Sequence, residues 1–184
     1  LKKILQYSYT FFFFFLIIPT VYSIVILNIH TKKYDQIITN VSYANDINQI
    51  AKTTIPDELW DIVCGRKDFS QGNQYIMLNE IFSGIQAMKM NSKDSINQEK
   101  LEVAFRTCTT LSNNIKKLEQ QIAKGYSVKE NEAFLDDIRT ITALFSDVMQ
   151  DFIMSEISIA NQTNKSYSFT VDKYVNTYVC ALKK

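Results

Sequence analysis

An apolar run near the N-terminus constrains this chain more than any other feature of its sequence. Residues 4–29 contain no charged side chain. As a helix, these 26 residues measure about 39 Å, which is enough to cross a hydrocarbon core of about 30 Å. The run is too long for a signal peptide and lacks the small residues of a cleavage site. We therefore expect residues 1–30 to form an uncleaved transmembrane anchor.

Basic residues lie on both sides of this run. Two lysines precede it, and two follow it beside the single histidine, His30. The positive-inside rule therefore comes close to a tie. The segment before the run is short and basic, which favours an N-terminus on the inside. We expect the chain at the cell membrane with residues 31–184 extracytoplasmic.

The composition after the run excludes several classes of protein. A net charge of +1 gives no field that would attract nucleic acid, so we expect no nucleic-acid partner. Only 4 glycines and 2 prolines occur, which argues against a sandwich or barrel with its many turns. Three cysteines without CxxC spacing and a lone histidine predict no metal site and no cofactor. We expect Cys108 in the core, and a Cys64–Cys180 disulfide stays open.

Apolar residues recur at intervals of three and four after residue 34, which is the spacing of packed helices. A first helix continues the apolar run and should end near residues 53–56, because Pro56 disfavours helix before it. A short helix over 57–64 should end at Gly65. A longer helix should cover 74–90. The stripe of the first helix, which we expect to be the dimer and signalling surface, consists of Ile37, Val41, Ala44, Asn48 and Ala51.

Two later stretches have the most regular spacing in the chain. The first stretch consists of Leu101, Ala104, Cys108, Leu111, Ile115, Leu118 and Ile122. The second consists of Phe134, Ile138, Ile141, Phe145, Val148, Phe152, Ser155 and Ile159. Capping boxes that pair Ser95 with Gln98 and Ser127 with Glu130 should start these two helices, and Gly125 should end the first. The short turn between them predicts an antiparallel hairpin.

The polar residues 161–166 should interrupt the helical pattern, and a last helix should cover 170–182. A short strand over 166–171 is the alternative. We expect an all-α fold, an antiparallel bundle of about four long helices plus a short one that continues from one N-terminal transmembrane helix. The expected domains are the anchor, a helical sensor domain over 31–160, and a membrane-returning helix or truncated tail over 161–184.

Five residues are candidates for binding a ligand: Trp60, Asp61, Arg66, Arg106 and Arg139. Trp60 is the only tryptophan and has charged neighbours, so it could floor a pocket for a polar or zwitterionic ligand. The alternative, which we favour, is a short helix that caps the bundle through Trp60. The guanidinium groups could bind a carboxylate, or could lie on solvated faces, where Arg106 would pair with Glu102 one turn away.

Two segments carry a resemblance to a known family. Residues 55–65 read IPDELWDIVCG, with Phe69 and Gln74-Tyr75 after them. Residues 34–40 read YDQIITN, followed by Ala44-Asn45. From the apolar run to about residue 157, the chain resembles the extracytoplasmic input region of bacterial sensor histidine kinases of the YesM-like class.

The resemblance implies a function in two-component signal transduction. In that family the input domain lies between two membrane helices and is followed by a HAMP linker, dimerisation helices with the phospho-accepting histidine, and an ATP-binding domain. We expect an unknown small-molecule or protein ligand, or a condition of the envelope, to shift the packing of the first and last helices. This movement needs a two-state interface, most simply a homodimer, and a cytoplasmic response regulator would be reached only through a kinase domain. No residue here matches those kinase motifs, so we expect no catalytic residue in this chain.

Two other functions stay open at this point. The first is the input domain of a chemoreceptor, which would share this architecture. The second is a single-span, membrane-tethered protein whose helical faces bind a partner or act as a scaffold. A coding sequence that continues past Lys184 into a second span would favour the kinase, and a stop there would favour the tethered protein.

Overall fold

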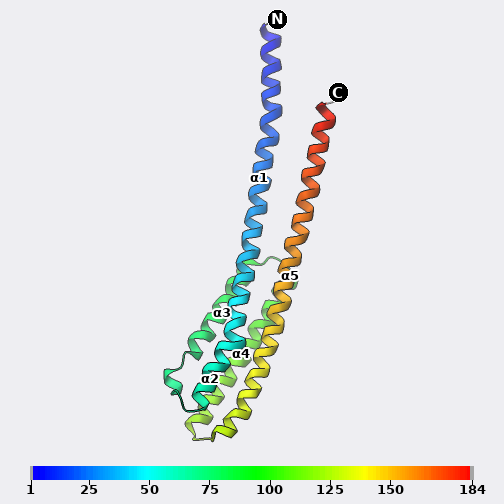
Figure 1. Cartoon of the computed structure of the whole chain (residues 1–184). Coiled ribbons are helices and arrows are strands. Elements are labelled where there is room, and N and C mark those ends of the chain that lie inside the picture. Colours follow the sequence, from blue (N-terminus) through cyan, green and yellow to red (C-terminus); the bar gives the residue numbers. More distant parts are fainter. Residues whose placement is uncertain (1, 183–184) are drawn as a thin grey trace. The chain divides into compact units, whose positions relative to one another are not determined.

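A computed structural model describes residues 2–182, with side chains placed at positions 7, 9, 13, 17, 18 and 20–173. The described residues form helices and no strand, so the prediction of an all-α fold is confirmed. In chain order the elements are α1 (Lys2–Gln49), the π-helical η1 (Ile50–Thr54), α2 (Ile55–Val63), the 3-10 turn η2 (Phe69–Gln71), α3 (Gln74–Asn91), α4 (Ser95–Ala123) and α5 (Val128–Leu182) (Figure 1).

The chain divides into two compact units. One consists of residues 1–36 and 160–184, and the other consists of residues 37–159. Helices α1 and α5 contribute residues to both units. Among the described residues, none of the helices combines the length and the apolar character that crossing a membrane requires.

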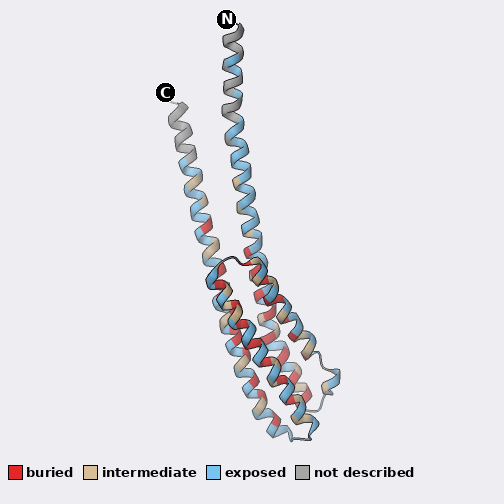
Figure 2. Ribbon diagram, turned by 180° about the vertical axis from the view of Figure 1, so that it is seen from behind, coloured by how far each residue is buried: buried red, intermediate tan, exposed pale blue. Residues whose placement is uncertain are grey.

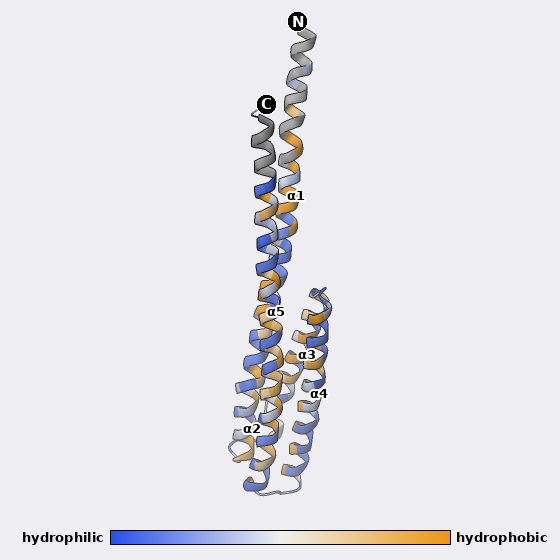
Figure 3. Ribbon diagram, turned by 90° about the vertical axis from the view of Figure 1, so that its right-hand side faces the viewer, coloured by the Kyte–Doolittle hydropathy of each residue, from blue (hydrophilic) through white to orange (hydrophobic). Residues whose placement is uncertain are grey.

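The unit of residues 37–159 is the predicted antiparallel bundle. Its four long stretches, from α1, α3, α4 and α5, alternate in direction (Figure 1). The connection between α3 and α4 lies at one end of this bundle, and the α2–α3 loop and the α4–α5 turn lie at the other. Buried residues form stripes along the inner faces of the helices (Figure 2). The same inner faces are largely hydrophobic, and the outer faces are mostly hydrophilic (Figure 3).

Helix α4 follows its predicted seam. Its stripe from Leu101 to Leu118 is fully buried, including Cys108, and Ile122 packs against the edge of the core. The seam of α5 is shifted from the prediction. Its buried positions include Asn131, Leu135, Ile138, Thr142, Phe145, Met149, Phe152 and Glu156. Phe134, Ile141 and Val148 are only partly buried against this core.

The predicted helix break before Pro56 does not occur. Thr54 and Ile55 both have helical backbone angles, and the turn over Ile50–Thr54 widens into a π-helix. Pro56 follows in the first turn of α2, and because proline has no N–H for the preceding turn and its ring crowds that turn, the π-helix is the local change in geometry with which the helix continues through it. The chain changes its helical geometry here without leaving the helix.

The predicted capping box is present at the start of α5 and absent at the start of α4. At α5, Ser127 and Glu130 form the predicted capping box, with 2.8 Å between Ser127 N and Glu130 Oε2. At α4 the predicted box at Ser95 is wrong. Asp94 is the cap, and its Oδ1 accepts from the backbone N–H groups of Ile96 and Asn97, each at 3.0 Å. The side-chain amide of Gln98 donates instead to the C=O groups that end α3.

The predicted interruption over 161–166 and the alternative strand are also wrong. Helix α5 runs from Val128 to Leu182. The segment is polar, but neither glycine nor proline occurs anywhere in this helix, so nothing in it breaks the backbone hydrogen-bond pattern.

The unit of residues 1–36 and 160–184 is a pair of helical segments. The Tyr34 hydroxyl donates to the Ala160 C=O at 3.2 Å, and the rings of His30 and Tyr167 meet edge to face with centroids 4.8 Å apart. Large apolar side chains of α1 lie 39% to 65% exposed in this unit: Ile17, Ile18, Val21, Tyr22, Ile24, Val25, Leu27 and Ile29.

Candidate functional site

Trp60 and Arg139 come together from distant parts of the sequence. Trp60 lies on α2, half-buried, with its indole packed against the core of the bundle. The guanidinium carbon of Arg139, on α5, lies 5.7 Å from the centre of the indole. This is a cation–π contact, and it holds the guanidinium next to a rigid aromatic surface. The prediction that α2 packs on the core through Trp60 and its neighbours agrees with the burial of Leu59 and Val63.

Arg139 and Arg66 each form an ion pair with a carboxylate. Arg139 Nη1 lies 2.8 Å from Asp136 Oδ1, one turn away on α5. Arg66 Nη2 lies 3.0 Å from Asp61 Oδ1 at the end of α2. All four side chains are about half exposed, and ion pairs at such positions are weak because water screens them. A carboxylate of a ligand can therefore compete with Asp136 for the guanidinium edge of Arg139.

A single carboxylate holds the loop that follows α2. Glu58 Oε1 accepts hydrogen bonds from Lys67 Nζ and from the backbone N–H of Asn73. The hydrogen bond from Lys67 is the main reason that the pKa of Glu58 lies below its usual range. Gly65 begins the loop with φ of +71°. The loop is therefore tied to the same short helix that carries Trp60.

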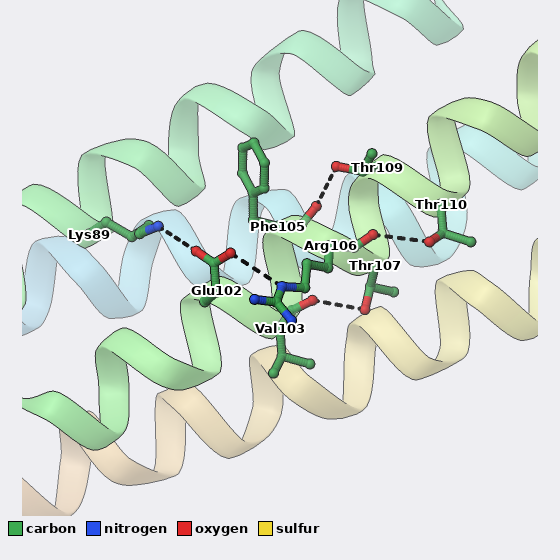
Figure 4. Close-up of polar contacts among 8 residues, drawn as sticks. All are labelled: Lys89, Glu102, Val103, Phe105, Arg106, Thr107, Thr109 and Thr110. Carbon is green, nitrogen blue, oxygen red and sulfur yellow. Dashed lines mark hydrogen bonds and ion pairs between the residues drawn. The ribbon is translucent and has the colours of Figure 1, made fainter.

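Arg106 belongs to a different cluster, on α3 and α4 (Figure 4). Its Nε lies 3.3 Å from Glu102 Oε1, which is the local pairing that the sequence predicted. Glu102 Oε2 lies 2.8 Å from Lys89 Nζ, so Glu102 joins the two helices and has a lowered pKa, mainly through Lys89. The ring of Phe105 lies 5.2 Å from that of Phe82. In the next turns of α4, hydroxyl groups donate to C=O groups four residues earlier: those of Thr107, Thr109 and Thr110.

The predicted signalling stripe of α1 lies partly inside the bundle. Ile37, Ala44 and Ala51 are buried within one copy of the chain, and Val41 and Asn48 are half-buried. Asn40 and Ile47, which the sequence reasoning did not select, complete the buried set. The inner stripe therefore packs against the other helices of the same bundle, and a contact between copies would use the exposed positions beside it.

No family model, no curated protein and no solved structure matches this chain. Its function must therefore be argued from its own residues.

Sequence reasoning missed one buried polar pair. Asn97 of α4 donates from Nδ2 to Glu156 Oε1 of α5 at 2.7 Å, and both side chains are buried. The burial of Glu156 was not predicted, because it occupies a seam position where an apolar residue is expected. The regular spacing of four and three along α5, once the seam begins at Asn131, would have placed Glu156 inside.

The remaining candidates concern metals and cysteines. Among the residues with described side chains, no three of His, Cys, Asp and Glu lie close enough to hold a metal ion. Cys64 and Cys108 are free thiols. The disulfide left open for Cys64 therefore has a free thiol at that end, and the side chain of Cys180 lies outside the described residues.

Proposed function

We propose that this chain is the membrane-anchored, extracytoplasmic input region of a transmembrane signalling protein of the sensor histidine kinase type. In this proposal residues 1–30 anchor the chain, and the bundle of residues 37–159 binds the signal. The kinase and its response regulator would belong to parts outside these 184 residues. The observation that carries the proposal is the uncharged run of residues 4–29, which leads within one helix, α1, to the core of a helical bundle.

The exposed side chains of α1 support the anchor. Between residues 17 and 29, the described large apolar side chains of this helix, apart from the half-buried Ile26, lie open to the surroundings rather than in a core. Isolated apolar residues on a surface are normal, but a continuous set of this size marks contact with a membrane or a partner. The absence of charge from residue 4 to residue 29 favours the membrane.

The contact between Trp60 and Arg139 is the proposed ligand site. Its chemistry suits a small molecule with a carboxylate, because the guanidinium offers a planar pair of donors and the indole offers an apolar surface beside it. Asp61, on the same short helix, and Arg66, in the loop after it, would bind a second polar group of a zwitterionic ligand. Ligand binding would draw α2 and α5 together.

A shift of α5 against α2 would then pass along the helices. Interfaces between packed helices move by about 1 to 2 Å in such transitions. Because α1 and α5 each contribute residues to both units, a displacement in the bundle can be carried along either helix toward the proposed anchor. An interface with a second copy of the chain would provide two alternative arrangements of the helices, and the ligand would shift the equilibrium between them.

Tryptophan fluorescence tests the ligand site directly, because Trp60 is the only tryptophan. The full chain in lipid nanodiscs would be titrated with acetate, glutamate and betaine as probes. We expect a change in emission with at least one carboxylate probe. Arg139→Gln should weaken binding roughly tenfold or more, since a lost charge-assisted hydrogen bond costs about 1.5 to 3 kcal/mol. Arg106→Gln is the matched control, and it should bind as the wild type does.

A response that is equal in the wild type and in Arg139→Gln would contradict the site. The same result would leave the anchor and the bundle intact, because neither depends on Arg139. The two other functions stay as alternatives, namely a chemoreceptor input domain and a membrane-tethered scaffold. They share the anchor with our proposal and differ from it in what the chain is attached to or binds.

Cross-linking tests the proposed homodimer. Single cysteines would replace exposed residues of α1, Thr39 and Asp46, in a chain with Cys64 and Cys180 changed to serine. Ala44→Cys is the control, because this position is buried within one copy. We expect disulfide-linked dimers from at least one exposed position and none from Ala44. Equal failure at both exposed positions would contradict a dimer through this helix.

A further inference from the structure

Three exposed lysines lie at one level of the paired segments of α1 and α5, just beyond the uncharged run. Lys32 and Lys33 follow this run on α1 within about one helical turn, and Lys165 lies on α5. The level of Lys165 is given by its neighbour Tyr167, because the ring centroid of Tyr167 lies 4.8 Å from that of His30 on α1. We call these three lysines the lysine belt.

No carboxylate forms an ion pair with the lysine belt in the part of the chain with described side chains. The ion pairs found there all involve other residues. Asp35 is the one acidic residue between positions 20 and 36, and it follows the lysines on the side away from the uncharged run. On α5, Asp172 is followed directly by Lys173, so these two residues add no net charge. The lysine belt therefore presents positive charge to its surroundings.

The lysines project from different sides of the helix pair. Residues two apart in a helix point in nearly opposite directions, because each residue turns the helix by about 100°. Lys32 lies two residues from His30, Lys165 lies two residues from Tyr167, and the two rings face each other. Lys32 and Lys165 therefore lie on opposite outer sides of the pair, with Lys33 about 100° round from Lys32. This arrangement suits small anions spread around the helices and does not suit one chain bound in a groove.

The length of the uncharged run places the lysine belt beside lipid headgroups. This step rests on the proposed function, in which the run is a membrane anchor. The run measures about 39 Å and the hydrocarbon core about 30 Å, so about 9 Å of the run extends into the headgroup layers on the two sides. The lysine belt then lies at the outer edge of one such layer, and the long, flexible side chains of lysine can reach its phosphate groups.

We propose that the lysine belt binds the phosphate groups of anionic phospholipids, so that the lipid in contact with the anchor is enriched in them. Each ammonium group donates hydrogen bonds to phosphate oxygens and is attracted by the negative potential of an anionic membrane surface. A zwitterionic phospholipid has the same phosphate next to a cationic group, so its net attraction to the lysines is weaker. The preference is therefore set by the net charge of the headgroup.

Electron paramagnetic resonance of spin-labelled lipids tests this preference. The full chain would be reconstituted in bilayers of phosphatidylcholine and phosphatidylglycerol, with a trace of either lipid that carries a nitroxide on its acyl chain. Lipid in contact with a membrane-embedded protein gives a motionally restricted signal. We expect a larger restricted fraction for phosphatidylglycerol than for phosphatidylcholine in the wild type.

The triple variant Lys32→Gln, Lys33→Gln, Lys165→Gln removes the charges of the lysine belt. The preference for phosphatidylglycerol should fall by roughly fivefold or more, since a single lysine near an anionic surface accounts for about a factor of five. The same three positions changed to arginine keep the charge and should keep the preference. A preference that persists in the glutamine variant would overturn the proposal.

A matched control shows whether the position of the lysines matters. Lys116→Gln, Lys117→Gln, Lys124→Gln removes an adjacent pair and a single lysine, all exposed, from the unit of residues 37–159. This variant should keep the preference of the wild type. An equal loss in this variant and in the glutamine variant of the lysine belt would overturn the proposal, because the preference would then depend on total charge.

The spectra of the wild type distinguish a failure of the lysine belt from a failure of the anchor. Equal restricted fractions for the two lipids would overturn lipid binding by the lysine belt and would leave the anchor in place. No restricted signal from either lipid would overturn the anchor, and the lysine belt with it. Neither readout requires a variant to fold.

Discussion

At the scale of single residues, Glu58 shows how one carboxylate can hold a loop. Its Oε1 meets Lys67 Nζ and the backbone N–H of Asn73, so the two sides of the α2–α3 loop are tied to α2. The hydrogen bond from Lys67, followed by the effect of Asn73, lowers the pKa of this carboxyl group despite an opposing effect of burial. The loop is thus held by these charged contacts as well as by the packing of Phe69 against the core.

Glu58→Gln should destabilise the bundle by about 1 to 2 kcal/mol at neutral pH, because charge-assisted hydrogen bonds are lost. A lowered pKa means that the contribution of Glu58 is present above its unfolded value of about 4.3 and is lost as the pH falls through the folded value. The difference in free energy of unfolding between the wild type and the variant should therefore shrink in acid. Denaturant unfolding at several pH values measures this difference.

Glu132→Gln is the control for this prediction. Glu132 is an exposed residue in the first turns of α5, and its substitution should change the free energy of unfolding by less than about 0.5 kcal/mol. A difference between the wild type and Glu58→Gln that stays constant from neutral to acidic pH would show that the carboxylate charge has no part in holding the loop.

At the scale of elements, the start of α4 shows that the residue with the sequence pattern of a helix cap is not always the residue that caps the helix. Ser95 and Gln98 have the spacing of a capping box, but Asp94 has the extended backbone of a cap and accepts from two N–H groups. Aspartate and serine are about equally good caps, so the sequence alone could not choose between neighbouring positions. In the structure Gln98 is not available as the capping-box partner of Ser95, because its side chain donates to the Lys89 and Ser92 C=O groups at the end of α3.

Alanine substitutions distinguish the two caps. Asp94→Ala should lower the free energy of unfolding by about 1 kcal/mol, because two backbone N–H groups lose their acceptor. Ser95→Ala, at the first position of α4, should have an effect of less than about 0.5 kcal/mol. Equal losses in the two variants, or a larger loss at Ser95, would contradict Asp94 as the cap.

Gly84 sets how closely α1 and α3 pack. A Cβ atom at this position would lie 2.7 Å from Ile47 Cγ2, which is closer than side chains tolerate. We expect Gly84→Ala to destabilise the bundle by about 1 to 3 kcal/mol, although alanine favours helix over glycine by about 1 kcal/mol. A double-mutant cycle with Ile47→Ala checks the cause. The cost of Gly84→Ala should fall in the Ile47→Ala background, and an unchanged cost would place the strain elsewhere.

The buried face of α5 could be predicted only in part from the spacing of apolar residues. Both Phe134 and Leu135 are apolar, and the spacing from Ile138 allows either as the preceding seam residue. The structure buries Leu135 and leaves Phe134 at the edge, because the true seam also includes Asn131, Thr142 and Glu156. Polar residues in a core cannot be recognised by hydrophobicity. The predicted α4 positions from Leu101 to Leu118 are apolar and all buried, whereas the buried polar residues Asn97 and Thr107 of the same helix were not predicted.

At the scale of the whole molecule, the sequence predicted the fold class and the order of the bundle helices. The contact between Trp60 and Arg139 could not be predicted from the sequence. The two residues lie far apart in the chain, and only the packing of α2 against α5 brings them together. Arg106 looked equivalent to Arg139 in the sequence, and its placement with Glu102 and Lys89 distinguishes it. Whether a charged residue on a helix face can take part in a site thus depends on the side chains of the helix that packs beside it.

The central claim is that the bundle lies outside a membrane in which residues 1–30 are anchored. Labelling of a single exposed cysteine tests this claim. Asn113→Cys, on the exposed face of α4, would be placed in a chain with Cys64 and Cys180 changed to serine and expressed in bacterial spheroplasts. Cys108 should stay unlabelled, because burial raises the pKa of its thiol to about 12.

A maleimide that cannot cross membranes would be added before and after lysis of the spheroplasts. We predict that Cys at position 113 reacts fully in intact spheroplasts, and that the labelled chain stays with the membrane after alkaline extraction. Labelling only after lysis, or release of the chain by alkali, would contradict the account.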